Sequence, residues 1–384
     1  MKVMFLAPYP LDSAPSQRFR FELFLKSMEE KGIEWELESF LNEKAWHALY
    51  EKGNSVEKAG FVLQGYLKRL IRLFRLGKFD KVFIHRELAP FGPPVFEWVI
   101  AKVLRKKIIY DFDDAIWLAD QTQENAIWKT LKWRKKVSSI CKWSWKVSAG
   151  NKYLRDYAAQ FCGSTFIMPT VVDTDLHNRG VSILRQAQHD TQSSKFEHLQ
   201  TLAPSQPKHI NTLTPSKPAI GWTGSHSTLF YLNPLIPILQ ELEQEVNFEF
   251  VVIANKDPEL PLKNYRFIKW QKETEASDLA TIAIGLMPLQ DDEWAQGKCG
   301  FKLIQYLSLG IPAIASPVGV NRQIISEGVN GFFATTLEEW KSAILKLIND
   351  PILREEFGKN GRQLIVDSYS KASLRKKFFS LLED

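Results

Sequence analysis

The stretch GKCGFKLIQYLSLGIPAIASPVGVNRQII, residues 297–325, carries the pattern that decides the fold. Its helical run, LIQYLSL, holds the polar side chain of Gln305 among apolar residues. Gly310 and Pro312 end this helix, because glycine fits a C-terminal cap and proline cannot continue the turn. A short apolar strand, AIAS, and a second loop, PVGVN, come next. The stretch therefore predicts a helix followed by a strand in an α/β domain.

Two lysines four residues apart, Lys298 and Lys302, stand at the start of that helix. The free backbone N–H groups and the positive end of a helix favour an anion there, and two ammonium groups add charge neutralisation. This arrangement suits a phosphate group. The alternative is an ordinary helix that carries a solvated pair of lysines.

The same string resembles the nucleotide-sugar-binding segment of retaining glycosyltransferases of the GT-B fold, family 4 (glycosyl transferases group 1). That segment reads like E-G-F-G-L-P-x-L-E-A-M-A-x-G-x-P-V-V-A-S, and GIPAIAS and PVGVNRQII match its later part. The two family glutamates fall on Gly297 and Gln305, and the lysine-rich form is that of a subset of members. The resemblance implies that Gln305 holds the ribose hydroxyls. The two lysines have no counterpart in the commonest family pattern, and we expect from their place at the helix start that they bind the diphosphate. It is clear over residues 217–335 and weaker over 1–175.

Composition limits the class of protein. The chain has 384 residues with 45% hydrophobic and 12% aromatic residues, enough for two domains with full cores. Three cysteines without pairing or metal spacing fit a reducing cytosol. The N-terminal run KVMFLAPYP is too short for a signal peptide, and no stretch is long and apolar enough to span a membrane. We therefore expect a cytoplasmic protein.

The positive charge is concentrated in the N-terminal part. Residues 1–177 hold 28 Lys+Arg and 21 Asp+Glu, a net charge of +7. The remaining residues have a net charge of −1, so the whole chain has a net charge of +6. Two stretches contribute to it, the helical run Leu67–Phe79 and the tryptophan-rich run Trp128–Val147. Cationic helices with tryptophan suit an anionic membrane surface, so we expect peripheral contact with the inner face of the cytoplasmic membrane. A core-packing helix with a charged outer face is the alternative, and no nucleic-acid motif is present.

Alternating strands and helices predict a parallel, doubly wound sheet in each half of the chain. Strands are expected around residues 2–10, 33–40, 80–87 and 106–114, and helices around 19–31, 55–77 and 94–103. The same alternation restarts at residue 217. The resemblance implies two Rossmann-like domains that face a cleft. We expect an N-terminal acceptor-side domain at residues 1–177 and a disordered insertion at 178–216. A nucleotide-sugar-binding domain is expected at 217–369, followed by a last helix at 370–384 that crosses back to the first domain.

The loop GWTGSHST follows the first strand of the second half. Gly221 and Gly224 allow a tight turn there, and Ser225 offers a hydroxyl beside free N–H groups that can bind phosphate oxygens. In the family this loop begins G-R, whereas Trp222 stands here in place of the arginine. Lys298 and Lys302 are expected to supply the missing charge.

The run YDFDDAIW ends a strand with Asp111, Asp113 and Asp114. Three carboxylates could bind Mg²⁺, but the GT-B resemblance implies a diphosphate site without a metal, so no cofactor is expected. The family places H-D at this point, with the histidine near the sugar. Asp113 and Asp114 occupy those positions and are expected to touch the donor sugar or the acceptor hydroxyl. The alternative for Asp114 is a helix cap.

Other polar residues lie at expected strand ends. His85, Arg86 and Glu87 lie at the end of the third strand and could meet the aspartates across the sheet edge. An ion pair between Arg86 and an aspartate is the alternative to an acceptor-side role. Arg18, in the loop after the first strand, is a second acceptor-side candidate. Asp292 precedes the lysine segment, where similar sequences place an acidic residue near the sugar hydroxyls.

The sequence thus predicts a glycosyltransferase that moves a sugar from a nucleotide-diphosphate donor to an acceptor hydroxyl, with retention. The family implies that the departing diphosphate is stabilised by positive charge and that the acceptor loses its proton to the leaving phosphate. A polysaccharide or lipid-linked acceptor is expected at the level of the family. A protein that binds a nucleotide sugar without turnover and a nucleotide-sugar epimerase remain as alternatives.

Overall fold

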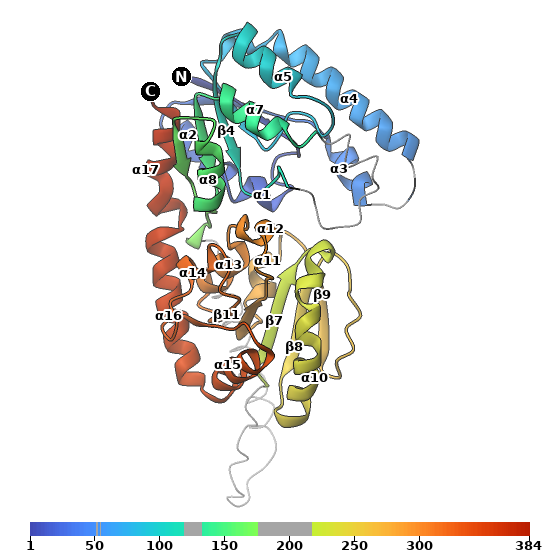
Figure 1. Cartoon of the computed structure of the whole chain (residues 1–384), viewed down its shortest axis with the longest axis vertical. Helices are drawn as coiled ribbons and strands as arrows, with labels where there is room; N and C mark the ends of the chain where they lie inside the picture. Colours follow the sequence, from blue (N-terminus) through green and yellow to red (C-terminus); the bar gives the residue numbers. More distant parts are fainter. Residues whose placement is uncertain (51–52, 54, 119–132, 176–216) are drawn as a thin grey trace, which may run out of the picture. The chain divides into compact units, whose positions relative to one another are not determined.

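The chain folds into two compact units, each an α/β structure around one parallel sheet (Figure 1). The computed structural model describes residues 1–384 except 51–52, 54, 119–132 and 176–216. The first unit comprises Met1–Val172, Asp291–Phe301 and Ser368–Asp384, and the second comprises Asp173–Gln290 and Lys302–Asp367. The fold class predicted from the sequence, a two-domain α/β chain with parallel sheets, is confirmed.

The sheet of the first unit has six parallel strands in the order β2-β1-β3-β4-β5-β6. The chain leaves the middle of the sheet in both directions, which is the order of a doubly wound fold. The strands are β1 (Lys2–Ala7), β2 (Glu34–Ser39), β3 (Lys81–His85), β4 (Lys107–Phe112), β5 (Lys146–Ala149) and β6 (Thr165–Ile167).

Helices cover both faces of this sheet because successive strand residues point to opposite sides. Met4, on one face, packs in a cluster with Ile100, Ile140 and Leu154, whereas Phe5, on the other, packs with Met28, Phe378 and Phe379. The helices and helical turns of the unit are α1 (Pro15–Arg18), η1 (Glu22–Phe24), α2 (Leu25–Glu30), α3 (Glu43–Tyr50), α4 (Ser55–Leu73), η2 (Leu76–Lys78), α5 (Val95–Trp98), a π-helical turn η3 (Val99–Val103), α7 (Lys136–Trp143), α8 (Lys152–Ala159), α12 (Glu293–Gln296) and α17 (Lys371–Leu382).

The second unit repeats the design with the strand order β12-β11-β10-β7-β8-β9. Its strands are β7 (Ala219–Gly224), β8 (Glu249–Ala254), β9 (Tyr265–Lys269), β10 (Ile284–Met287), β11 (Ala313–Ala315) and β12 (Gly331–Phe333). Its helices and helical turns are η4 (His226–Tyr231), η5 (Asn233–Leu235), α10 (Ile236–Glu245), α11 (Glu275–Leu279), α13 (Phe301–Ser308, whose first residue belongs to the first unit), α14 (Asn321–Ile324), α15 (Leu337–Asn349) and α16 (Pro351–Ser368).

The division of the chain differs from the predicted one at residues 291–301. The sequence placed this segment in the second domain, whereas it packs with the first unit. The cause is local burial: the ring of Phe301 lies 4.5 Å from that of Phe19, and the thiol of Cys299 is buried against the backbone of Asp113. The insertion predicted at 178–216 lies outside the described residues.

The helix predicted at residues 19–31 is interrupted. The structure has the short α1, the turn η1 and then α2. The interruption follows from Arg20, whose side chain turns inward to Asp111 while Phe19 and Phe21 are buried beside it. Three consecutive inward side chains cannot lie on one face of a continuous helix.

The two basic stretches also differ from expectation. The alternative for the first stretch, a helix that packs its apolar side on the core, is wrong: Leu67, Leu70 and Phe74 are exposed, and it is the basic face of α4 that packs inward. In the second stretch Lys136 is buried against Glu87 and Lys146 is buried, whereas Lys135 and Lys142 are exposed. Residues 128–132 lie outside the described part. No described helix has the length and apolar character that a membrane span needs.

Candidate functional site

The strand β7 and the start of α13 meet at one pair of side chains in the second unit. The ammonium group of Lys302 lies 5.4 Å from the centroid of the Trp222 ring. Trp222 is buried and Lys302 is partly buried. A cation over an indole face is held by the ring quadrupole, so Trp222 fixes the lysine at the first turn of α13.

Tyr306 locks α13 onto the sheet. Its hydroxyl accepts a hydrogen bond from the backbone N–H of Thr223 at 3.0 Å, and its ring packs where a side chain on Gly285 would stand. Burial raises the pKa of Tyr306, so the phenol stays protonated. Because Tyr306 is one helical turn after Lys302, this anchor also fixes the position of the lysine relative to β7.

The predicted loop glycines are needed for close packing. A Cβ on Gly221 would lie 2.2 Å from Ile282, and one on Gly224 would lie 2.6 Å from the Trp222 ring. Gly221 is inside the buried strand β7, while Gly224 ends that strand and Ser225 is exposed just beyond it. Of these three predicted donor-binding residues, Ser225 and Gly224 are therefore at the strand end, and Gly221 is interior.

Gln305 faces the interior. It is buried, and its amide donates to Oε1 of Glu275 at 3.2 Å, which also accepts from the indole N–H of Trp270. The side chain predicted to hold ribose hydroxyls is thus already engaged inside the unit.

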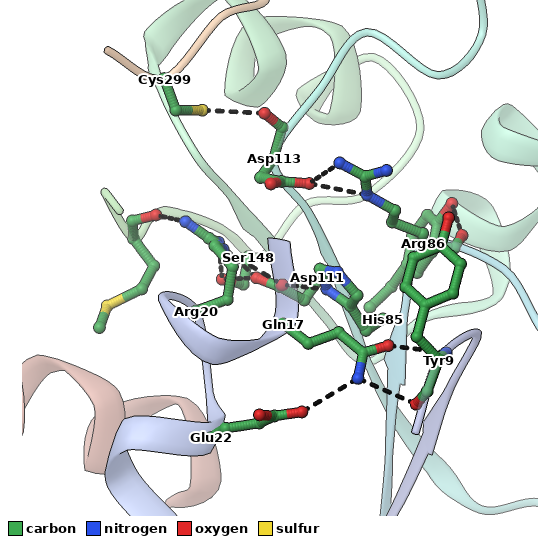
Figure 2. A network of polar contacts seen from close by, with 12 residues as sticks. Tyr9, Gln17, Arg20, Glu22, His85, Arg86, Asp111, Asp113, Ser148 and Cys299 are labelled. Atoms are coloured by element: carbon green, nitrogen blue, oxygen red, sulfur yellow. Dashed lines mark hydrogen bonds and ion pairs between the residues drawn. The ribbon is translucent and has the colours of Figure 1, made fainter. Parts of the chain in front are cut away.

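A buried polar network lies at the carboxyl ends of β3 and β4 in the first unit (Figure 2). Asp111 is its centre, and its carboxylate accepts hydrogen bonds from Arg20, from Ser148 at 2.7 Å and from Nδ1 of His85 at 2.8 Å. Arg20 also donates to the backbone carbonyl of Met168. The network ties the loop after β1 to three strands of the sheet.

The electrostatics of Asp111 follow from this geometry. Burial by itself raises the pKa of the carboxyl, but the charge of Arg20 and the hydrogen bond from His85 outweigh it and hold the pKa well below its ordinary value. Asp111 therefore remains ionised. Nε2 of His85 is buried and has no hydrogen-bond partner among the described residues.

Arg86 and Asp113 form a second pair at the same strand ends. Nη2 and Nε of Arg86 lie 2.7 and 2.9 Å from Oδ1 of Asp113. Arg86 adopts a left-handed backbone with φ of 59°, which a non-glycine residue keeps only where its surroundings hold it. Its guanidinium outweighs burial and lowers the pKa of Asp113. The ion pair considered as the alternative role of Arg86 is present.

Asp114 is paired with Lys298, at 3.1 Å between Nζ and Oδ2, and that ammonium also lies 4.7 Å from the Trp294 ring. The segment that carries Lys298 is fixed beside it, because Asn151 donates to the carbonyls of Gln296 and Lys298. Lys298 and Lys302 thus belong to different units, and Lys298 already has a carboxylate partner.

The remaining candidates have local partners. Asp292 caps α12 by accepting from the backbone of Ala295 at 2.7 Å. Arg18 lies 3.6 Å from Asp12. Glu87 pairs with the buried Lys136 at 2.5 Å.

Arg20 and Ser148 were not expected from the sequence as partners of Asp111, whereas the segment His85–Glu87 was expected to be able to meet the aspartates across the sheet edge, and His85 does so. A signal existed in part, since His85 and Asp111 end neighbouring strands, and parallel strands bring such residues to one edge. Each of Asp111, Asp113 and Asp114 has a different cationic partner, and the described residues contain no group of three or more side chains suited to a metal ion.

Comparison with protein families gives one match. Residues 259–364 match the family described as glycosyl transferases group 1. This range contains α11, β10, α13 and the loop after β11, so it includes Lys302 and Gln305. A comparison with curated proteins yields no match.

Solved structures share the whole fold. The chain is similar to Anabaena HepE in complex with UDP and glucose (14% identity, TM-score 0.64, 100% of this chain and 99% of that one). It is also similar to sucrose-phosphate synthase from Thermosynechococcus elongatus (12%, 0.67, 100% and 98%). WaaG, a glycosyltransferase involved in lipopolysaccharide biosynthesis, matches as well (13%, 0.59, 100% and 100%). The predicted resemblance to GT-B glycosyltransferases is confirmed, for the fold over the whole chain and for the family over residues 259–364.

Proposed function

We propose that this chain is a glycosyltransferase that moves a sugar from a nucleotide-diphosphate donor to an acceptor hydroxyl with retention of configuration. We propose that it is of the family 4 type, transfers a hexose and acts in the cytoplasm in the synthesis of a cell-surface polysaccharide or glycolipid. The observation that carries the proposal is Lys302 held over Trp222 at the start of α13, within the segment that matches glycosyl transferases group 1.

The second unit is the proposed donor-binding part. Lys302 brings a full positive charge to the N-terminal turn of α13, where free backbone N–H groups also favour an anion. Trp222 stands where the resembled loop has an arginine, and it lies directly under the ammonium group of Lys302. This pairing supports the idea that the lysine replaces the missing arginine. Gly224 and the exposed Ser225 provide the strand-end backbone for further phosphate contacts.

The proposed chemistry is stabilisation of the leaving group. As the bond between sugar and diphosphate breaks, negative charge grows on the phosphate oxygens. A lysine already fixed by an aromatic ring and a helix anchored by Tyr306 meet that charge without reorganising, which is how preorganised groups lower a barrier. The acceptor hydroxyl then gives its proton to the leaving phosphate, so no enzyme nucleophile and no metal ion are required.

The first unit is the proposed acceptor-side part. Asp113 and Asp114 directly follow β4 as partly exposed carboxylates, each held by one cation. We propose that one of them orients a sugar or acceptor hydroxyl and that Arg86 holds Asp113 in place. The buried Asp111 network supports these strand ends from beneath.

The test is a donor panel followed by an assay of turnover. Thermal shifts with UDP, GDP and their sugar conjugates should show stabilisation by a preferred donor that grows with concentration. Nucleotide should then be released at an appreciable rate only when donor and acceptor are both present. Thermal stabilisation by a donor without release of nucleotide, whichever acceptor is added, would favour a protein that binds a nucleotide sugar without turnover. Interconversion of the free nucleotide sugar would favour an epimerase. No stabilisation by any nucleotide would contradict the proposal.

A further inference from the structure

Helix α4 of the first unit is amphipathic in an unusual sense, because it turns its charged side inward. The guanidinium of Arg69 is buried and donates to the carbonyls of Ala7 and Leu88 and to Glu38. Arg72 pairs with Glu38 at 2.8 Å. The cations of α4 are therefore the means by which it is attached to the edge of the sheet.

The opposite side of α4 is apolar and exposed. Five residues at spacings of three, four or seven share this face, and Phe74 is 85% exposed and Leu67 52% exposed. The members are Val56, Leu63, Leu67 and Leu70 of α4 and Phe74 in the turn directly after it, with Ile71 beside them.

A second exposed apolar strip continues the surface on the neighbouring helix. Figure 1 shows α4 and α5 side by side, and Tyr66 of α4 contacts Phe96 of α5. Val95, Trp98 and Val103 are exposed on α5 and η3. We call the exposed apolar residues of α4, α5 and η3, together with Phe74, the α4–α5 patch. A contiguous apolar surface of this kind marks an interaction site.

The charges at the edge of the patch select its partner. Arg75, Lys102 and Arg105 are exposed beside the apolar residues, and the nearest exposed acid on α4 is Glu57. Among the residues that the structure describes, none of these three cations forms an ion pair, so their charges are not neutralised. An apolar helix face flanked by cations and a tryptophan fits the boundary between anionic headgroups and acyl chains.

We propose that the α4–α5 patch docks onto an anionic lipid surface, with Leu63, Leu67, Leu70 and Phe74 inserted among the acyl chains. The inference goes beyond glycosyl transfer and does not rest on it, because the patch belongs to the first unit, whereas Trp222 and Lys302 belong to the second. The apolar side of α4 meets the lipid, while Lys68, Arg69 and Arg72 of the helix hold it to the protein.

Vesicle co-sedimentation tests the proposal with phosphatidylcholine vesicles that contain or lack phosphatidylglycerol. Binding should require phosphatidylglycerol and weaken as salt is added. The triple variant L67Q/L70Q/F74Q should bind about tenfold more weakly or worse, since three apolar side chains leave the lipid. The variant R75E/K102E should lose the preference for phosphatidylglycerol. The matched control V329Q/I352Q, which alters exposed apolar residues of the second unit, should bind like the parent chain.

A site-specific label gives a second readout. The three native cysteines are buried, so an environment-sensitive dye on Leu67→Cys should shift to the blue with anionic vesicles while one on Ile352→Cys should not. Equal vesicle binding by parent and triple variant, or no binding by the parent, would overturn the proposal. A parent dimer that the triple variant converts to monomer, without vesicle binding, would instead make the patch an interface between two copies and would also overturn it.

Discussion

The ammonium group of Lys302 lies 5.4 Å from the ring centroid of Trp222, and this contact joins the first turn of α13 to the strand β7. The two residues are eighty positions apart in sequence. Trp222 stands where the resembled glycosyltransferases have an arginine, and its indole ring positions Lys302. The predictions below follow from this contact and from the packing that supports each unit.

Gly224 should tolerate no side chain, because a Cβ there would lie 2.6 Å from the Trp222 ring. We expect Gly224→Ala to move the ring, to cost about 1–3 kcal/mol of stability and to lower activity by displacing Lys302. Gly60→Ala is the control, since no atom lies within 4 Å of its Cβ position and alanine favours the helix. Thermal unfolding and initial rates measure both effects, and a Gly224→Ala variant as stable and active as the parent would refute the close contact.

Asp111 should stabilise the first unit strongly because its loss leaves Arg20 as a buried cation without its carboxylate. We expect Asp111→Asn to cost about 3–5 kcal/mol in urea unfolding at neutral pH. Asp156→Asn, which removes an exposed ion pair with Lys152, should cost no more than about 1 kcal/mol.

The same substitution should change the response to acid. The folded pKa of Asp111 is depressed, so its contribution is complete above the unfolded pKa of about 3.9 and is lost as the pH falls toward the lower folded value. The stability gap between the parent and Asp111→Asn should therefore narrow when the pH is lowered below about 4. A gap that widens on acidification would contradict the assignment of Asp111 as an ionised group.

The helix α17 should be essential to the first unit although it is last in sequence. The ring of Phe378 stacks on Phe24 at 4.3 Å between centroids, and both belong to the core beneath β1. We expect Phe378→Ala to cost about 3–5 kcal/mol, whereas Lys376→Ala, at an exposed position of the same helix, should change stability little. Comparable losses in the two variants would mean that α17 does not pack into this core.

The strands were predictable from sequence because buried parallel strands are continuous apolar runs, as in KVMFLA and FEFVVIA. The orientation of α4 was not, since it has apolar residues on both sides, and the side that turns inward depends on distant partners of its cations, such as Glu38 of β2 and the carbonyl of Leu88. The same limit applies to the site. Motif spacing identified Lys298, Lys302 and the aspartates, but the pairing of Lys298 with Asp114 joins positions 184 residues apart, and no local pattern encodes such a contact.

Arg18 and Arg20 lie only two residues apart, yet their side chains have different surroundings. Both follow the first strand, and sequence reasoning chose Arg18 as the functional candidate. In the structure it is Arg20 that enters the Asp111 network, because the chain between α1 and η1 turns its side chain inward. Two arginines two residues apart cannot be distinguished until the path of that turn is known.

The most direct test of the account is the turnover of Lys302→Ala under saturating donor and acceptor. We predict a fall in kcat of about 100- to 1,000-fold with unchanged thermal stability. Lys346→Ala is the matched control, since Lys346 lies 5.1 Å over the Phe332 ring of the same unit, and it should retain the parent rate. A Lys302→Ala protein that is folded and transfers sugar as fast as the parent would contradict the claim that this lysine stabilises the departing diphosphate.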